Sequence, residues 1–124
     1  FLKLNNLKFK IYINPKKIYN IFKKSELAIS AGGTTLYELA ALKIFTIALP
    51  VENDQIKIIN FLKKKKFVEK IDLKQNNLSK NINVFKRAIN DHKYRKKISN
   101  NFSKQLSSSG IRLISKKILQ LYEK

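Results

Sequence analysis

The residues best suited to chemistry in this sequence are two glycines followed by two threonines and, three positions later, a glutamate. They occupy the stretch from Ala31 to Thr35, and the glutamate is Glu38. Paired glycines permit a tight turn whose backbone N–H groups can approach a ligand closely. Where such a turn leads into a helix, the first N–H groups of the helix are unpaired and attract anions. The stretch therefore predicts a binding site for an anionic group.

Three apolar segments position this turn. Residues 27–30 are an apolar run of strand length, and residues 34–42 are apolar on nearly every side, as a buried helix would be. Residues 45–49 are almost wholly apolar, which is typical of a strand covered on both faces. Pro50 ends that strand at the edge where ligand-binding loops gather in open α/β sheets. The sequence thus predicts strand, turn, helix and strand, with the turn at the ligand-binding edge.

The amino-acid identities in these segments are more specific than their pattern of strands, turn and helix. The motif from Ser30 to Glu38 reads Ser-Ala-Gly-Gly-Thr-Thr-Leu-Tyr-Glu, and Glu-Asn-Asp-Gln follows Pro50 at positions 52–55. Together they resemble the carboxyl-terminal domain of GT-B-type nucleotide-sugar enzymes. The resemblance is strongest to the UDP-sugar hydrolases of pseudaminic acid biosynthesis and their spore-coat polysaccharide relatives, and more distant to the glycosyltransferase that forms lipid II. It is close over about residues 25 to 60 and weaker elsewhere.

The resemblance implies two groups of site residues in this chain. The turn would lie against the UDP diphosphate and the helix glutamate would hold the ribose hydroxyls; these residues are Ala31, Gly32, Gly33, Thr34, Thr35 and Glu38. The sugar would lie near the segment after the next strand, which supplies Glu52, Asn53 and Gln55. Relatives have adjacent Asn-Gln where this chain has Asp54 inserted between them, so the register of the sugar contacts stays open. The resemblance implies no cofactor and no metal.

Each of these residues also has a structural interpretation. Thr35 and Glu38 have the spacing of a capping box, in which Thr35 would accept from a helix N–H and Glu38 would reach back to the N–H of the cap. The glycines would permit the turn, whether or not a phosphate lies on it. Asn53 and Asp54 are common turn formers and helix caps, and Asp54 is expected to cap the helix that follows.

The same resemblance predicts that residues 1–124 are one nucleotide-sugar-binding domain from a two-domain enzyme, with residues 78–124 as its helical tail. In relatives, two βα units and a whole domain with the catalytic histidine come before the part that corresponds to this chain. We therefore expect no catalytic residue here, no activity in isolation, and two partners, a UDP-sugar and the missing domain. A hydrolase is the first hypothesis, a UDP-sugar glycosyltransferase is the alternative, and the present residues do not distinguish them.

The net charge of +19 introduces a hypothesis of another class, a basic nucleic-acid-binding module. Its distribution argues against that class, because residues 26–55 carry a net charge of −3 and only three of the 27 basic residues are arginine. Abundant Lys, Asn and Ile together indicate an AT-rich genome, so we expect no nucleic-acid partner. The chain has no cysteine and no apolar run long enough to span a bilayer, which favours a cytoplasmic protein.

The remaining patterns complete an α/β fold. Residues 7–13 alternate apolar and basic residues as a half-buried strand does, and residues 67–71 form a shorter strand. Helices are predicted over residues 15–24, from Asp54 to about Lys64, and over 79–90, about 92–106 and 110–122. The expected fold is a Rossmann-like parallel sheet of about four strands with flanking helices and a helical carboxyl-terminal tail.

The two strands absent by comparison with such domains would have separated residues 7–13 from residues 27–30 in the usual strand order. Without them, residues 27–30 have an unpaired edge. We expect residues 7–13 to move beside residues 27–30 within a single chain, because the helix over 15–24 is long enough for a right-handed crossover. In solution we expect the edge to recruit another chain at least in part.

Overall fold

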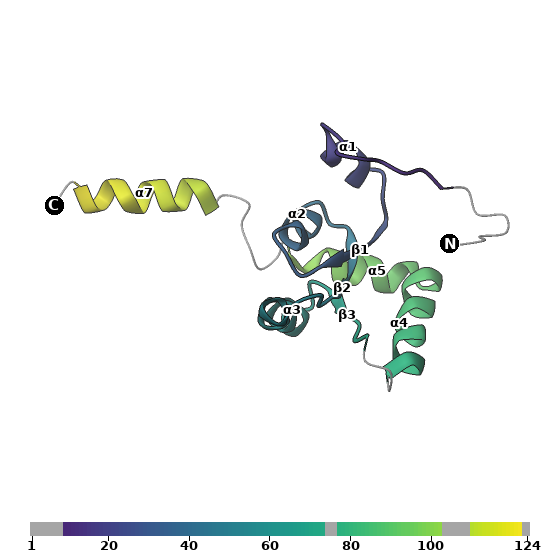
Figure 1. The fold of residues 1–124 in the computed structure, drawn as a ribbon. Helices are drawn as coiled ribbons and strands as arrows, with labels where there is room; N and C mark the ends of the chain where they lie inside the picture. The colour runs from purple at the N-terminus through teal and green to yellow at the C-terminus, as the bar shows by residue number, and fades with distance from the viewer. Residues whose placement is uncertain (1–8, 74–76, 103–109, 123–124) are drawn as a thin grey trace.

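A three-stranded parallel sheet forms the centre of the protein, as a computed structural model describes it over residues 9–73, 77–102 and 110–122. Its strands are β1 (Leu27–Ala31), β2 (Phe45–Leu49) and β3 (Glu69–Lys70), in the order β1-β2-β3 (Figure 1). All five residues of β1 pair with β2, from Leu27 opposite Phe45 to Ala31 opposite Leu49. The carboxyl ends of β1 and β2 therefore meet at one edge of the sheet, where each strand continues into a loop.

Helices cover both faces of this sheet (Figure 1). On one face, α2 (Thr35–Ala41) and α3 (Asn53–Lys64) bury their apolar residues with Ala48 of β2. On the other face, α4 (Leu78–Asn90) and α5 (His92–Ser99) pack against Phe45 and Ile47. Residues 44–48 are all buried, because β2 is the central strand and receives helices from both sides. This confirms the prediction of a doubly covered strand.

Two helices contribute little to this core. The first, α1 (Ile18–Phe22), has no buried residue and lines a cavity of about 500 Å³ together with α2. The other, α7 (Gly110–Tyr122), leaves its large apolar side chains exposed; they include Leu113, Ile114, Ile118, Leu119, Leu121 and Tyr122. The bounds predicted for this last helix, 110–122, are confirmed.

The α/β class and the parallel sheet with flanking helices are confirmed, but the described sheet has three strands and not about four. Residues 9–13 form no strand, so the predicted pairing of residues 7–13 with β1 is wrong for these positions; residues 7 and 8 lie outside the described part. The helix meant to carry the crossover is also shorter than predicted, spanning Ile18–Phe22 instead of residues 15–24. Among the described strands, only β2 pairs with β1, on one side of it.

Other bounds shift by a few residues. The helix α3 begins at Asn53 with Glu52 as its N-cap residue, so the predicted cap at Asp54 is wrong; Asp54 lies in the first turn. The strand predicted over residues 67–71 is reduced to β3, in which Glu69 and Lys70 pair with β2. The helix α5 ends at Ser99, and residues 103–106 of the predicted longer helix lie outside the described residues.

Candidate functional site

The turn after β1 is tight and ordered by its own backbone. The N–H of Gly33 donates to the carbonyl of Ala31 at 3.0 Å, and the N–H of Leu36 donates to the carbonyl of Gly33 at 3.1 Å. Gly32 is buried whereas Gly33 and Thr34 are exposed. The turn therefore presents its second half, and not its first, to solvent.

Gln55 connects this turn to the loop after β2. Its Oε1 atom accepts from the N–H of Gly32 at 3.2 Å and from the N–H of Val51 at 3.0 Å. The residue reaches both groups because it lies in the first turn of α3, above the carboxyl ends of the two strands. One amide oxygen thus joins the two loops at the carboxyl-terminal edge of the sheet.

Gly32 is required by close packing and not by its backbone angles, since no glycine of the described residues has a positive φ. A Cβ atom added at Gly32 would lie 2.6 Å from Cβ of Gln55 and 2.8 Å from Cδ1 of Ile59. A Cβ atom at Gly33 would meet nothing within 4 Å. The first glycine therefore lets α3 approach the turn, and the second is needed by no packing contact.

The amides of the turn divide into occupied and available groups. The N–H groups of Gly32 and Gly33 are engaged by Gln55 and Ala31, so the resemblance-based assignment of both glycine amides to a diphosphate meets competing acceptors. Among the described residues, no acceptor lies on the N–H groups of Thr34 and Thr35. Those two amides, with their neighbouring hydroxyls, are the donors left for an anion.

The capping-box alternative for Glu38 is not formed. The N-cap residue of α2 is Thr34 and not Thr35, and it makes no side-chain capping bond. Glu38 is exposed and borders the cavity between α1 and α2, which Ile18, Tyr19 and Phe22 also line. Its carboxylate is therefore not committed to the helix start.

The residues assigned to the sugar separate into two kinds. Glu52 and Asn53 are exposed at the start of α3, where Glu52 makes no side-chain capping bond. Gln55 is half-buried, and its amide oxygen is turned toward the two loops. The fold brings Gly32 and Gln55 into contact. Glu38 lies on α2, about one helical turn after the start of that helix.

A second polar cluster, which sequence reasoning missed, joins residues of α3, β3, α4 and α5. The hydroxyl of Tyr94 donates to the Glu69 carboxylate, which also has Nζ of Lys63 at 3.8 Å. The guanidinium of Arg87 stacks on the Tyr94 ring at 3.6 Å from its centroid, and Phe45 packs beside it. Burial first, and then the bond and charge of Glu69, raise the pKa of Tyr94. No local spacing predicts this cluster, because Glu69 and Tyr94 come from different elements.

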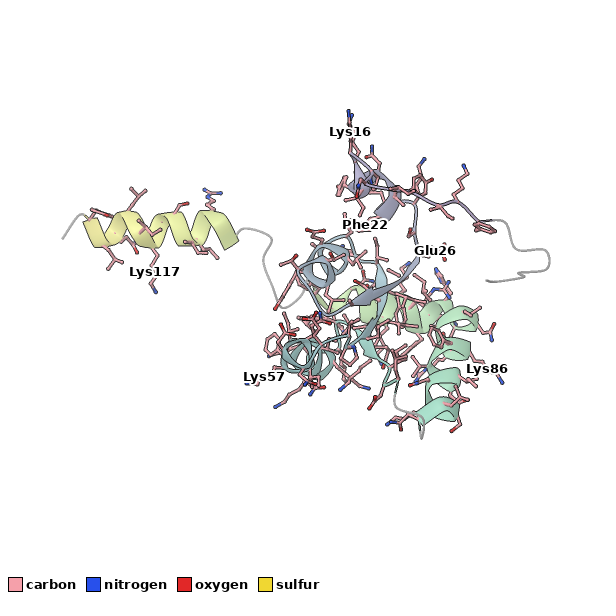
Figure 2. The ribbon with its side chains drawn as sticks, in the orientation of Figure 1. Lys16, Phe22, Glu26, Lys57, Lys86 and Lys117 are labelled. Atoms are coloured by element: carbon pink, nitrogen blue, oxygen red, sulfur yellow. The ribbon has the colours of Figure 1, made fainter. Side chains whose placement is uncertain are left out.

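Positive charge is spread over the surface and is not gathered at one site. Figure 2 shows Lys16 just before α1, Lys57 on α3, Lys86 on α4 and Lys117 on α7, in separate parts of the molecule. Within the described ranges, no group of three or more His, Cys, Asp or Glu side chains is placed to hold a metal ion. Nor does any helix in the described part of the chain have both the length and the apolar character needed to cross a membrane.

The chain was also compared with known proteins. Neither protein-family models, nor curated proteins, nor solved structures give a match to it.

Proposed function

We propose that this chain binds the nucleotide part of a UDP-sugar at the carboxyl-terminal edge of β1 and β2. The observation that carries the proposal is the Gln55 bridge, which holds the loops after β1 and β2 together at that edge. Open parallel sheets bind ligands at this edge. The bridge fixes the turn so that the free amides of Thr34 and Thr35 stay in place for an anionic group.

The proposed contacts follow from the exposure of each residue. The diphosphate would accept from the amides of Thr34 and Thr35, with Gly33 leaving room for its close approach because no side chain occupies that position. The ribose hydroxyls would donate to the exposed carboxylate of Glu38. The sugar would lie toward Glu52 and Asn53, which are exposed on the neighbouring loop.

The proposed reaction is hydrolysis of the UDP-sugar. A water oxygen would attack the anomeric carbon, the bond from that carbon to the diphosphate oxygen would break, and UDP would leave. The turn amides would stabilise the negative charge that develops on the leaving diphosphate. The exposed carboxylates at this edge are Glu38 and Glu52, which the proposal assigns to binding, and Asp54. The base that activates the water would come from a further domain. Attack by a sugar hydroxyl in place of water would make the same site serve a glycosyltransferase.

A titration followed by amide resonances tests the proposal. UDP added to the ¹⁵N-labelled chain should shift the amides of Gly33, Thr34 and Thr35 and the resonances around Glu38. Inorganic sulfate at equal ionic strength is the control for simple anion attraction, which a chain of net charge +19 will show in any case. Shifts confined to the lysine-rich helices, or equal shifts with sulfate and UDP, would contradict a nucleotide site at the turn.

Nucleic-acid binding is the competing function, and salt separates it from the proposal. A duplex-binding module should bind any DNA with an affinity that falls steeply as salt rises, because phosphate contacts release counterions. A UDP site that uses neutral amides and Glu38 should lose much less affinity over the same range. Fluorescence anisotropy with a labelled duplex, beside the UDP isotherm at each salt concentration, measures both.

A further inference from the structure

The outer edge of β1 is unpaired in the described structure. All five residues of β1 pair with β2 on one side, and no other described strand lies on the opposite side. In a parallel strand, alternate residues point their N–H and C=O groups to the outer edge, where they are available to another strand. The side chain of Ile29 is also 55% exposed on this strand, because α4 and α5 cover β2 more fully than β1.

A segment suited to that edge lies elsewhere in the same chain. Residues 9–13, Phe-Lys-Ile-Tyr-Ile, alternate as a half-buried strand does but form no strand in the structure. Their apolar side chains are strongly exposed: Phe9 by 69%, Ile11 by 77% and Ile13 by 85%. In Figure 1 the segment runs out from α1 and lies apart from the sheet. In the described part of the chain, the outer edge of β1 is therefore unpaired, and a segment with a strand-like sequence pairs with no strand.

Pairing within one chain is restricted by the connection. Thirteen residues, 14–26, separate the segment from β1, which is close to the dozen or so residues that a parallel crossover needs at minimum. Those residues include α1, which lines a cavity with Ala41 of α2 and with Leu42, the residue that follows this helix. Pairing between two chains has no such limit, because the segment of one chain approaches the edge of the other freely.

Charge favours this combination over the pairing of two β1 edges. Residues 1–25 contain seven lysines and no acidic residue, whereas residues 26–55 carry a net charge of −3. Glu26 immediately precedes β1; its side chain is 76% exposed, although its carboxylate pairs with the guanidinium of Arg95 at 3.0 Å, and Glu38 is exposed without an ion pair among the described residues on the helix that follows. A β1-to-β1 contact would bring like charges together, and a contact between the segment and β1 brings opposite charges together.

We propose that two copies of this chain associate by reciprocal exchange, in which residues 9–13 of each copy pair with the outer edge of β1 of the other. The contact is isologous, so each dimer contains it twice. Phe9, Ile11 and Ile13 lie on one side of the added strand, where they cover Ile29 and extend the apolar face of the sheet. The proposal is independent of nucleotide binding.

Two variants test the exchange, one for each half of the contact. Ile29→Lys places a charge on the edge strand, and Ile11→Lys places one on the segment. Both positions are exposed, so neither change should alter the melting temperature of the monomer measured by circular dichroism. Sedimentation velocity from about 5 to 200 µM should show a monomer–dimer equilibrium for the unaltered chain. The dissociation constant of the dimer should be at least about tenfold higher for each variant. Ile89→Lys, at an exposed apolar position of α4, is the matched control and should dimerise normally.

A mixture of the two variants is the decisive sample. The Ile29→Lys chain keeps an intact segment and the Ile11→Lys chain keeps an intact edge, so the mixture should form a heterodimer through one remaining contact more readily than either variant dimerises alone. A chain that stays monomeric over the whole range would overturn the proposal and indicate pairing within one chain or none. Dimers that resist Ile11→Lys but not Ile29→Lys would overturn it in favour of β1-to-β1 pairing. Failure of the mixture to associate would overturn it as well.

Discussion

Gln55 lies against Gly32 in two ways at once. Its side-chain oxygen accepts a hydrogen bond from the Gly32 N–H at 3.2 Å. Its Cβ atom lies only 2.6 Å from the position that a Cβ atom at Gly32 would take. The glycine and the glutamine are 23 positions apart in the sequence. Their contact joins the loops at the carboxyl ends of β1 and β2, so the geometry of the candidate site depends on a residue pair from two separate elements.

Removing the acceptor at Gln55 should destabilise the fold. In Gln55→Ala the buried N–H of Gly32 loses its partner, and an unsatisfied buried donor costs about 1–3 kcal/mol. The N–H of Val51 loses less, because Val51 is exposed and water can replace the bond. Urea unfolding measures the change. Gln55→Met keeps a side chain of similar length without the acceptor oxygen, so it should be destabilised almost as much as Gln55→Ala; a Gln55→Met variant that keeps the stability of the unaltered chain would mean that packing, and not the hydrogen bond, is what Gln55 contributes.

The two glycines of the turn should respond differently to alanine. Gly32→Ala would force a Cβ atom to within 2.6 Å of Gln55 and 2.8 Å of Ile59, so we expect overpacking to cost about 1–3 kcal/mol. Gly33→Ala meets no atom within 4 Å and should be neutral or stabilising by about 0.4–1 kcal/mol through the unfolded chain. Paired urea titrations give the comparison. A Gly33→Ala variant as unstable as Gly32→Ala would contradict the packing explanation.

Glu38→Gln should affect binding and not folding. If its carboxylate holds the ribose, the loss of a charge-assisted bond should weaken UDP binding by about 1–3 kcal/mol. Because no capping bond involves this side chain, the free energy of unfolding should change little. Calorimetric titration with UDP and a denaturation curve on the same preparation separate the two effects. Asp54→Gln removes a carboxylate of similar exposure on α3 and serves as the charge-matched control.

Tyr94→Phe should remove one hydrogen bond, and it should reduce the loss of folding stability that occurs at alkaline pH. At neutral pH the lost bond to Glu69 should cost about 0.5–1.5 kcal/mol, while the ring keeps its contacts with Phe45 and Arg87. Burial raises the pKa of Tyr94 in the folded protein above its ordinary value of 10.0. A raised pKa in the folded state stabilises the fold below the unfolded pKa and loses that contribution as pH rises past about 10.

The comparison of unfolding free energies at about pH 8 and pH 11 checks this linkage. The unaltered chain should lose more stability over that interval than Tyr94→Phe, which has no phenol to ionise. Lysine deprotonation affects both proteins alike and cancels in the difference. Identical losses in the two proteins would show that Tyr94 ionises as easily in the folded state as in the unfolded state.

The sequence by itself determined the elements whose signals are local. Residues 45–49 form a strand at the predicted bounds because four apolar residues and one β-branched threonine between a turn and a proline are typical of a short buried strand. The helix over 110–122 and the one over 79–90, observed at Leu78–Asn90, follow from helical spacing. The glycine turn was located for the same reason. The identity of its ligand is still a prediction, because a turn of this kind fits many anions.

Tertiary structure alone decided which groups are free. A sequence does not show that the Gly32 amide is engaged by Gln55, because that bond depends on the approach of α3 to β1. The same is true of Thr35 and Glu38, whose spacing fits a capping box that does not form because the helix begins with Thr34 as its cap. Residues 9–13 have the alternation of a strand, yet a strand exists only where another strand supplies its hydrogen bonds. The alternation of apolar and polar residues shows that a segment favours the strand conformation. Whether a neighbouring strand is present to pair with it depends on the packed fold.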